Sequence, residues 1–201
     1  MSSMRKQIYV TLRSRIISKE LPPGFRLREQ DLATEFGASR TPVREALLDL
    51  EKDSLVNTID RAGTFVAKVS FEDLKEAFEV RLALMPLVAR LLLDHTAPEL
   101  IGALEGIHAE MKAAKSSEEL TALDSRFHDL LNHATGNRLL KAVLSKARWT
   151  IERGCSYPDA VTAEFGDEVV AVIEALQDRS LDRLDELLYR HAKRYVEELF
   201  R

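Results

Sequence analysis

Apolar residues recur every three or four positions along most of the chain, which is the spacing of one buried helix face. This spacing predicts helices over about 4–18 and 28–35, and a third helix that begins near Thr41. The stretch KELPPGFRL separates the first two helices, because its two prolines and its glycine break a helix. Two β-rich segments follow, LVNTI and GTFVAKV, which we expect to form a hairpin with Gly63 at its tip.

From Ser70 onward the pattern is helical alone. It predicts six helices, over about 70–95, 97–115, 117–134, 137–154, 160–178 and 180–200. The fold class is therefore mainly α, and the chain divides into two parts, residues 1–69 and residues 70–201. We expect the second part to be an all-helical bundle of about six helices.

The two parts differ in charge as well as in pattern. Residues 1–69 hold 12 Lys and Arg against 9 Asp and Glu, a net of +3, which leaves −7 for the rest of a chain whose formal charge is −4. We therefore expect only the first part to meet a polyanion. With 45% hydrophobic and 31% charged residues, the composition is that of a folded globular protein and argues against a disordered one.

The number of cysteines and the hydropathy of the chain indicate the cellular compartment of the protein. Cys155 is the single cysteine, so a disulfide framework within the chain is excluded, and we interpret Cys155 as a structural residue. The segment MSSMRKQIYV lacks the apolar core of a signal peptide, and no apolar run is long enough to span a bilayer. These observations predict a cytoplasmic protein without a membrane partner.

The segment SRTPVREAL brings DNA-binding chemistry to the start of the third helix. Two hydroxyls and two guanidinium groups fall within about one and a half turns, from Ser39, Arg40, Thr41 and Arg44. In a helix-turn-helix unit the N-terminal end of the second helix enters the major groove, where Arg contacts guanine or phosphate. The alternative is that both arginines pair on a solvated face with nearby acids, namely Glu35, Glu45 or Asp49.

The segment LPPGFRLREQDLATEFGASRTPVREALLDLEKDSLV, followed by RAGTFVA, resembles the winged helix-turn-helix of the GntR family of bacterial transcription regulators. The likeness covers about residues 5–68 and places the helix-turn-helix at about Glu29 to Leu48. It implies that residues 1–69 form a winged helix-turn-helix domain that binds double-stranded operator DNA. The implied DNA contacts come from Arg28, Ser39, Arg40, Thr41, Arg44 and the wing around Gly63. Gln30 stands where the family often has an Arg that contacts DNA. The resemblance therefore does not predict which operator sequence the protein binds.

Residues 70–201 resemble the helical effector-binding and dimerisation domain of the FadR-type subgroup, an FCD-like domain. The likeness lies in LDSRFHDLLNHATGNRLL and VIEALQDRSLDRLDELLYRHA. In many such domains an Asp and three His bind a divalent metal, and a small carboxylate effector binds against that metal. Asp124, His128 and His191 match three of these positions, and Val169 falls on the remaining His position. The resemblance implies one divalent transition metal, such as Zn, Ni or Mn, held by an incomplete ligand set.

The spacing of these residues leaves the metal question open. Asp124 and His128 are four apart on one helix face, and two His with one carboxylate can hold a transition metal with open positions. The alternative is a polar cluster whose members bond to one another or to water. Glu168 lies beside the lost position but projects about 100° away on its helix, which makes it a poor substitute. His133, about 140° around from His128, should not join the site.

Arg81 lies in EVRLAL, where the family often has an Arg that faces the effector pocket. An inward Arg would bind a carboxylate through two of its three guanidinium nitrogens. The alternative is an Arg that reaches solvent or pairs with an acid from another helix. Met85 stands where the family commonly has Glu, so we expect an effector less polar than a sugar acid, or one that binds without metal. The segment KARWTIERGC adds Arg148, Trp149 and Arg153 as candidates for the pocket lining, although we expect Trp149 to lie in the core.

The function predicted from these features is a ligand-responsive DNA-binding transcription regulator and not an enzyme. The resemblance implies a homodimer that reads two half-sites, and a repressor whose operator affinity is changed by a small carboxylate metabolite. Two alternatives stay open. One is a small metal-dependent enzyme that uses Asp124, His128 and His191, and the other is an effector-independent DNA-binding protein.

Overall fold

The computed structural model describes residues 3–154 and 161–199. Within this part of the chain, contacts between residues define two compact units. The first contains the residues up to Leu74 together with Glu152–Gly154, and the second contains Lys75–Ile151 and the described residues from 161 onward. The fold is mainly α, as predicted, with a small sheet confined to the first unit.

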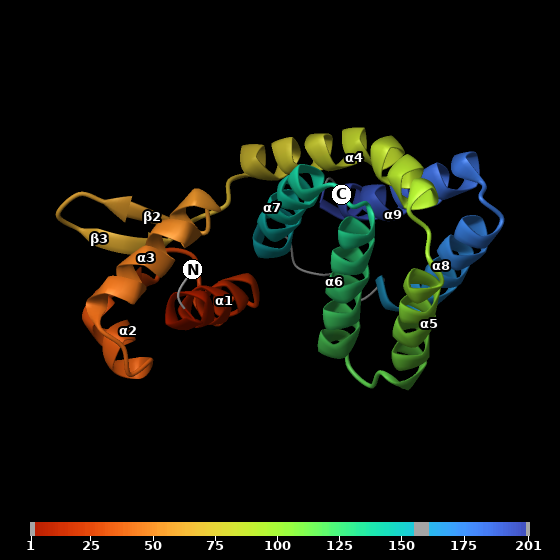
Figure 1. Cartoon of the computed structure of the whole chain (residues 1–201). Helices are drawn as coiled ribbons and strands as arrows, with labels where there is room; N and C mark the ends of the chain where they lie inside the picture. Colours follow the sequence, from red (N-terminus) through yellow and green to blue (C-terminus); the bar gives the residue numbers. More distant parts are fainter. Residues whose placement is uncertain (1–2, 155–160, 200–201) are drawn as a thin grey trace. The chain divides into compact units, whose positions relative to one another are not determined.

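Three helices and a three-stranded sheet form the first unit (Figure 1). They are α1 (Ser3–Ile17), β1 (Arg26–Leu27), α2 (Glu29–Glu35), α3 (Arg40–Lys52), β2 (Val56–Ile59) and β3 (Gly63–Val66). Helix α1 packs along α3, and each contributes a fully buried apolar stripe, with Ile8 and Leu12 from α1 and Val43 and Leu50 from α3. This shared core fixes the direction in which α3 points.

The sheet of the first unit has the order β1-β3-β2, and all pairs are antiparallel. The hairpin of β2 and β3 was predicted, whereas β1 was not, because two residues are too few to show the alternation of a strand. The prediction that Gly63 lies at the hairpin tip is wrong. Gly63 is the first residue of β3 and pairs with Ile59, so the tip is formed by Asp60, Arg61 and Ala62.

Among the described residues, six helices form the second unit and the segment that leads into it. They are α4 (Phe71–Asp94), α5 (Pro98–Ala113), α6 (Ser117–Ala134), α7 (Arg138–Gly154), α8 (Val161–Gln177) and α9 (Leu181–Leu199). Every predicted helix is present, with bounds within two residues of the predicted ones. Side-chain caps explain some of this agreement, since Ser70 Oγ accepts from the Asp73 amide and Asn137 Oδ1 accepts from the Leu140 amide.

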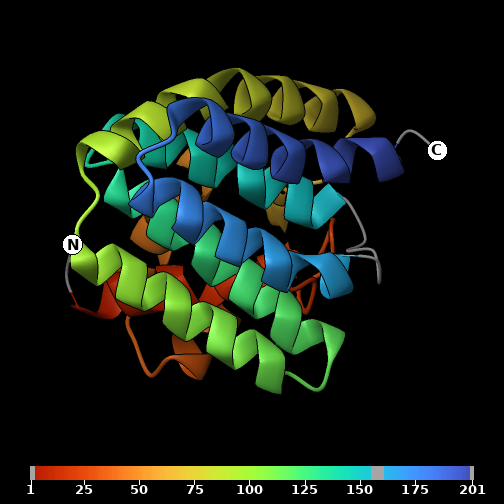
Figure 2. The ribbon, with the colours of Figure 1, turned by 90° about the vertical axis from the view of Figure 1, so that its right-hand side faces the viewer.

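The second unit is built around one apolar core. Helix α8 lies between α5 and α9 (Figure 2), and its buried face includes Phe165 and Val169. Both residues belong to the same buried cluster as Phe127 of α6 and Leu184 of α9. Among the described residues, no helix combines the length and the apolar character needed to cross a membrane.

Candidate functional site

The start of α3 is the first candidate site, and it is exposed. Ser39 precedes the helix, and Ser39, Arg40, Thr41 and Arg44 all face solvent. Gly37, with a φ of +58°, makes a left-handed turn between α2 and α3. The opposite face of α3 is buried, so its polar end is held on a rigid support.

Neither arginine of this site pairs with the acids proposed in the alternative interpretation. Arg40 donates from Nη2 to Oε1 of Gln30 at 3.2 Å, and Arg44 donates from Nε to Oε2 of Glu29 at 2.6 Å. The acids of that alternative bind arginines of α1 instead: Asp49 accepts two hydrogen bonds from Arg5, which also lies 3.7 Å from Glu45, and Glu35 accepts one from Arg15. Both arginines thus face α2 rather than the core.

Arg28 and the hairpin add further polar groups to the first unit. Arg28 is exposed and occupies the N-cap position of α2 without a side-chain capping bond. At the hairpin tip the side chain of Arg61 is 93% exposed. Gly63 has a φ of +111°, and a Cβ at this position would lie 3.3 Å from Nε of Arg26, so the sequence needs glycine here. The cationic tip residue, Arg61, was missed because Gly63 had been placed at the tip.

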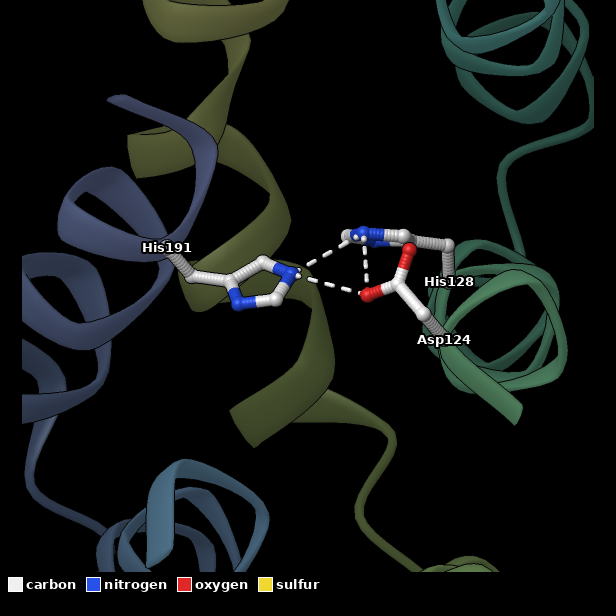
Figure 3. Close-up of side chains that lie close together, drawn as sticks. All are labelled: Asp124, His128 and His191. Atoms are coloured by element: carbon white, nitrogen blue, oxygen red, sulfur yellow. Dashed lines mark hydrogen bonds and ion pairs between the residues drawn. The ribbon is translucent and has the colours of Figure 1, made fainter. Parts of the chain in front are cut away.

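The second candidate site joins α6 and α9 in the helical unit. Asp124 and His128 extend from α6 toward His191 of α9 (Figure 3). The two Nε2 atoms are 3.0 Å apart, and Oδ1 of Asp124 lies 3.6 Å from Nε2 of His128 and 3.4 Å from Nε2 of His191. Atoms that share one divalent transition metal, at bonds of about 2.0–2.2 Å, lie roughly 2.8–3.6 Å apart. The three donor atoms therefore fit a single metal ion.

The site is buried, and its protonation follows from that. Burial raises the pKa of Asp124, but His128, His191 and Arg81 outweigh burial and hold this pKa below its usual value. Burial lowers the pKa of His128 well below its usual value, with further lowering by Arg81, His191 and Arg148, although Asp124 opposes it. The carboxylate is therefore ionised and His128 is neutral at pH 7, which are the forms that ligate metals.

Glu168 stands behind His191 rather than among the donor atoms. Its Oε2 atom accepts a hydrogen bond from Nδ1 of His191 at 2.8 Å, on the ring nitrogen that faces away from Asp124. A carboxylate in this position orients a metal-binding His and leaves its Nε2 toward the ion. The prediction that Glu168 is a poor replacement ligand is consistent with this geometry, but its contact with His191 was not predicted. Val169 is fully buried in the apolar core.

Arg81 points inward, toward the two histidines. It is 5% exposed, and Nη2 lies 2.9 Å from Nε2 of His128. Arginine has only donors, so His128 accepts through Nε2 and carries its own proton on Nδ1. The alternative in which Arg81 reaches solvent is therefore wrong.

A pocket opens beside these residues, and α4, α6, α7 and α9 all contribute to it. It is lined by Arg81, Met85, Val88, His128, Leu131, Asn132, Leu144, Arg148, Leu188 and His191. Arg148, 6% exposed, donates from Nη2 to Oδ1 of Asp129 at 2.8 Å. Two guanidinium groups and an apolar wall suit an anion with an apolar body. Arg148, a candidate for the pocket lining from its sequence segment, does line the pocket. Trp149, predicted as core, is only half-buried.

Two further residues considered in the sequence analysis, His133 and Cys155, do not belong to this site as the structure describes it. Nδ1 of His133 lies 3.2 Å from Nζ of Lys141, and His133 is absent from the set of donor atoms that converge, as expected. Cys155 lies outside the described residues.

Comparison with known protein families identifies the class. The model of the bacterial regulatory proteins of the gntR family matches residues 4–66, and the FCD domain model matches residues 76–194. A DNA-reading winged helix-turn-helix followed by a helical effector-binding domain defines a transcription regulator rather than an enzyme. The chain belongs to the GntR family of bacterial regulatory proteins and carries an FCD domain.

Individual relatives agree with this assignment. The uncharacterised HTH-type transcriptional regulator YdhC of Bacillus subtilis (strain 168) is 34% identical over 142 residues, which are 69% of this chain and 63% of that protein. The HTH-type transcriptional repressor RspR of Escherichia coli (strain K12) is 27% identical over 206 residues, 98% of this chain and 89% of that protein. The solved structure of E. coli McbR/YncC has a TM-score of 0.85 at 21% identity, with 100% of this chain and 98% of that chain covered, and it shows a shared fold.

Proposed function

We propose that this regulator binds operator DNA through the exposed start of α3 and is a repressor that a small carboxylate releases. The observation that carries the DNA-binding proposal is the pairing of Arg40 and Arg44 with exposed polar groups of α2, on a helix whose other face is buried. Arginines in such a position reach base edges in the major groove. Ser39 and Thr41 lie beside them and supply hydroxyls for phosphate oxygens.

The proposed DNA-binding surface extends beyond α3. Arg28 lies at the N-terminus of α2, and Arg61 and Gly63 belong to the hairpin that forms the wing. Cations at the tip of a wing bind phosphates or enter the minor groove. The boundary between the DNA-binding domain and the effector domain is proposed at residues 69 and 70.

The proposed effector site is the pocket beside Arg81. The guanidinium groups of Arg81 and Arg148 would bind a carboxylate, and the apolar side chains around Met85 would cover the rest of the molecule. Asp124, His128 and His191 would hold one divalent ion such as Zn, Ni or Mn, which supplies a further positive charge for the anion. The less polar lining favours a carboxylate with an apolar body over a sugar acid.

Regulation follows from the coupling of two binding events. We propose a cytoplasmic homodimer in which two winged domains read the half-sites of a near-palindrome. An effector that binds the DNA-free arrangement of the dimer more tightly lowers operator affinity by linkage. Repression is proposed by analogy with the repressor RspR, which matches almost the whole chain.

Selection of bound duplexes from a random DNA library tests this function. We expect enrichment of an inverted repeat, and a fluorescence anisotropy titration that weakens when a panel of carboxylates is added. Failure to enrich any sequence would contradict the DNA-binding proposal. Enrichment followed by an affinity that no carboxylate changes would contradict only the effector proposal.

A further inference from the structure

One nitrogen atom of the helical unit, Nε2 of His128, both contacts a guanidinium and belongs to a set of donor atoms that fits a metal ion. Nε2 of His128 accepts a hydrogen bond from Nη2 of Arg81 at 2.9 Å. The same Nε2 atom belongs to the group of donor atoms that fits a metal ion, 3.0 Å from Nε2 of His191 and 3.6 Å from Oδ1 of Asp124.

A neutral imidazole nitrogen has a single lone pair in the plane of the ring. A hydrogen bond from a guanidinium and a bond to a metal both use that lone pair, so His128 cannot make both. Charge acts in the same direction, because a divalent ion placed among these donors would repel the guanidinium of Arg81 at short range and in a buried site. The contact of Arg81 with His128 therefore opposes metal binding.

We infer that Arg81 controls metal loading: the ion and the guanidinium exclude one another at Nε2 of His128, and metal binding displaces Arg81 toward the pocket. This inference rests on the proposed role of the pocket as the effector site. A displaced Arg81 is available to a carboxylate beside Arg148 and Asn132, which line the same pocket.

Linkage gives the inference a second consequence. A carboxylate that draws Arg81 away from His128 leaves the lone pair to the metal, so anion binding and metal binding strengthen each other by the same factor. The regulator then responds to the two ligands together more strongly than to either one. Arg81 acts as the coupling residue, because it contacts His128 in one state and the anion in the other.

Metal titration of the full-length protein, without DNA, tests the competition. We would add Co²⁺ and follow its visible absorption in the parent protein, in Arg81→Met and in Arg90→Met. Arg90→Met is the control, because Arg90 lies on the same helix, is exposed, and its substitution removes the same positive charge. In the parent, Co²⁺ must replace the hydrogen bond that the charged Arg81 donates to His128. Arg81→Met removes this hydrogen bond, so the variant should bind Co²⁺ about tenfold more tightly than the parent. Arg90→Met should bind like the parent. Equal or weaker binding by a folded Arg81→Met protein overturns the inference.

A second measurement follows the Arg81 side chain in the parent protein by NMR. In ¹⁵N spectra of the arginine side chains, the signal of Arg81 is assigned by its disappearance in Arg81→Lys. Saturating Zn²⁺ should shift this signal and leave the signal of Arg90 in place. Zn²⁺ that binds without a change at Arg81 overturns the inference. Both measurements read the metal site alone, so their failure would leave the proposed DNA and effector binding intact, and a failure of operator selection would leave the metal result intact.

Discussion

Arg44 at the start of α3 donates from Nε to Oε2 of Glu29 on α2 at 2.6 Å, while 62% of its side chain stays exposed. An exposed ion pair contributes about 0–1 kcal/mol. A bidentate contact between Arg and guanine contributes about 1–3 kcal/mol of discrimination. With Arg44 as the proposed base-contacting residue, DNA is expected to outcompete Glu29 for it, because the ion pair is the weaker of the two interactions.

The first prediction concerns Arg44 itself. Arg44→Ala should weaken binding of the selected operator by about 1–3 kcal/mol, because the base contact is lost. The free energy of unfolding should change by less than about 0.5 kcal/mol, since the side chain is exposed. Fluorescence anisotropy and urea unfolding measure the two effects. Arg126→Ala, which removes an exposed cation paired with Glu110 in the helical unit, is the control and should leave operator affinity unchanged.

The second prediction concerns the wing. Gly63→Ala should destabilise the first unit by about 1–3 kcal/mol, because a φ of +111° is rarely adopted by residues with a Cβ and the new methyl meets Arg26. Gly102→Ala should instead stabilise α5 by about 0.5–1 kcal/mol, because a Cβ there meets nothing within 4 Å. Thermal unfolding by circular dichroism compares the two variants. Stabilisation by Gly63→Ala would contradict the assigned backbone conformation.

The third prediction concerns the carboxylate behind His191. Glu168→Gln should weaken Co²⁺ binding about 10- to 100-fold, because a charged acceptor on Nδ1 orients the ring and makes Nε2 a better ligand. Glu174→Gln is the matched control, since Glu174 lies on the same helix but pairs with exposed Arg183. Isothermal titration calorimetry measures both. Identical affinities in the two variants would show that Glu168 plays no part in metal binding.

The fourth prediction concerns Tyr9 on α1. Burial and a hydrogen bond donated to Asp53 raise the pKa of the Tyr9 hydroxyl to about 12. Between pH 10 and 12 the unfolded chain releases this proton and the folded chain keeps it, so the stability contributed by Tyr9 is present below pH 10 and is lost as pH rises through this window. An ultraviolet titration should show a late phenolate that Tyr9→Phe removes. A late transition that persists in Tyr9→Phe belongs to another tyrosine.

The helices could be predicted from the sequence because their signals are local. Apolar spacing sets the buried face, and residues such as Ser70 and Asn137 mark the first turns through their own side chains. Strand β1 gives no such signal. Arg26 and Leu27 become a strand because β3 lies beside them, and this pairing joins parts of the chain that are far apart in sequence.

The sequence could predict those residues of the candidate site that match a family position or share a helix face. Asp124 and His128 share a face of α6, and the structure brings both to His191. The contacts of Arg81 with His128 and of Glu168 with His191 link different helices, and helical spacing contains no information about which helices meet. For the same reason the sequence made Arg148 only a candidate for the pocket lining, without showing which helices it would face.

The central position of β3 has a mechanical consequence. Because β3 bonds to β1 on one edge and to β2 on the other, the hairpin is anchored along both sides of its inner strand and cannot swing as a loose flap. Under the DNA binding proposed above, the duplex would meet a hairpin held by hydrogen bonds on both edges of β3. Operators of unequal groove width would then differ in how much the nucleic acid itself must deform, and that elastic penalty becomes part of the selectivity.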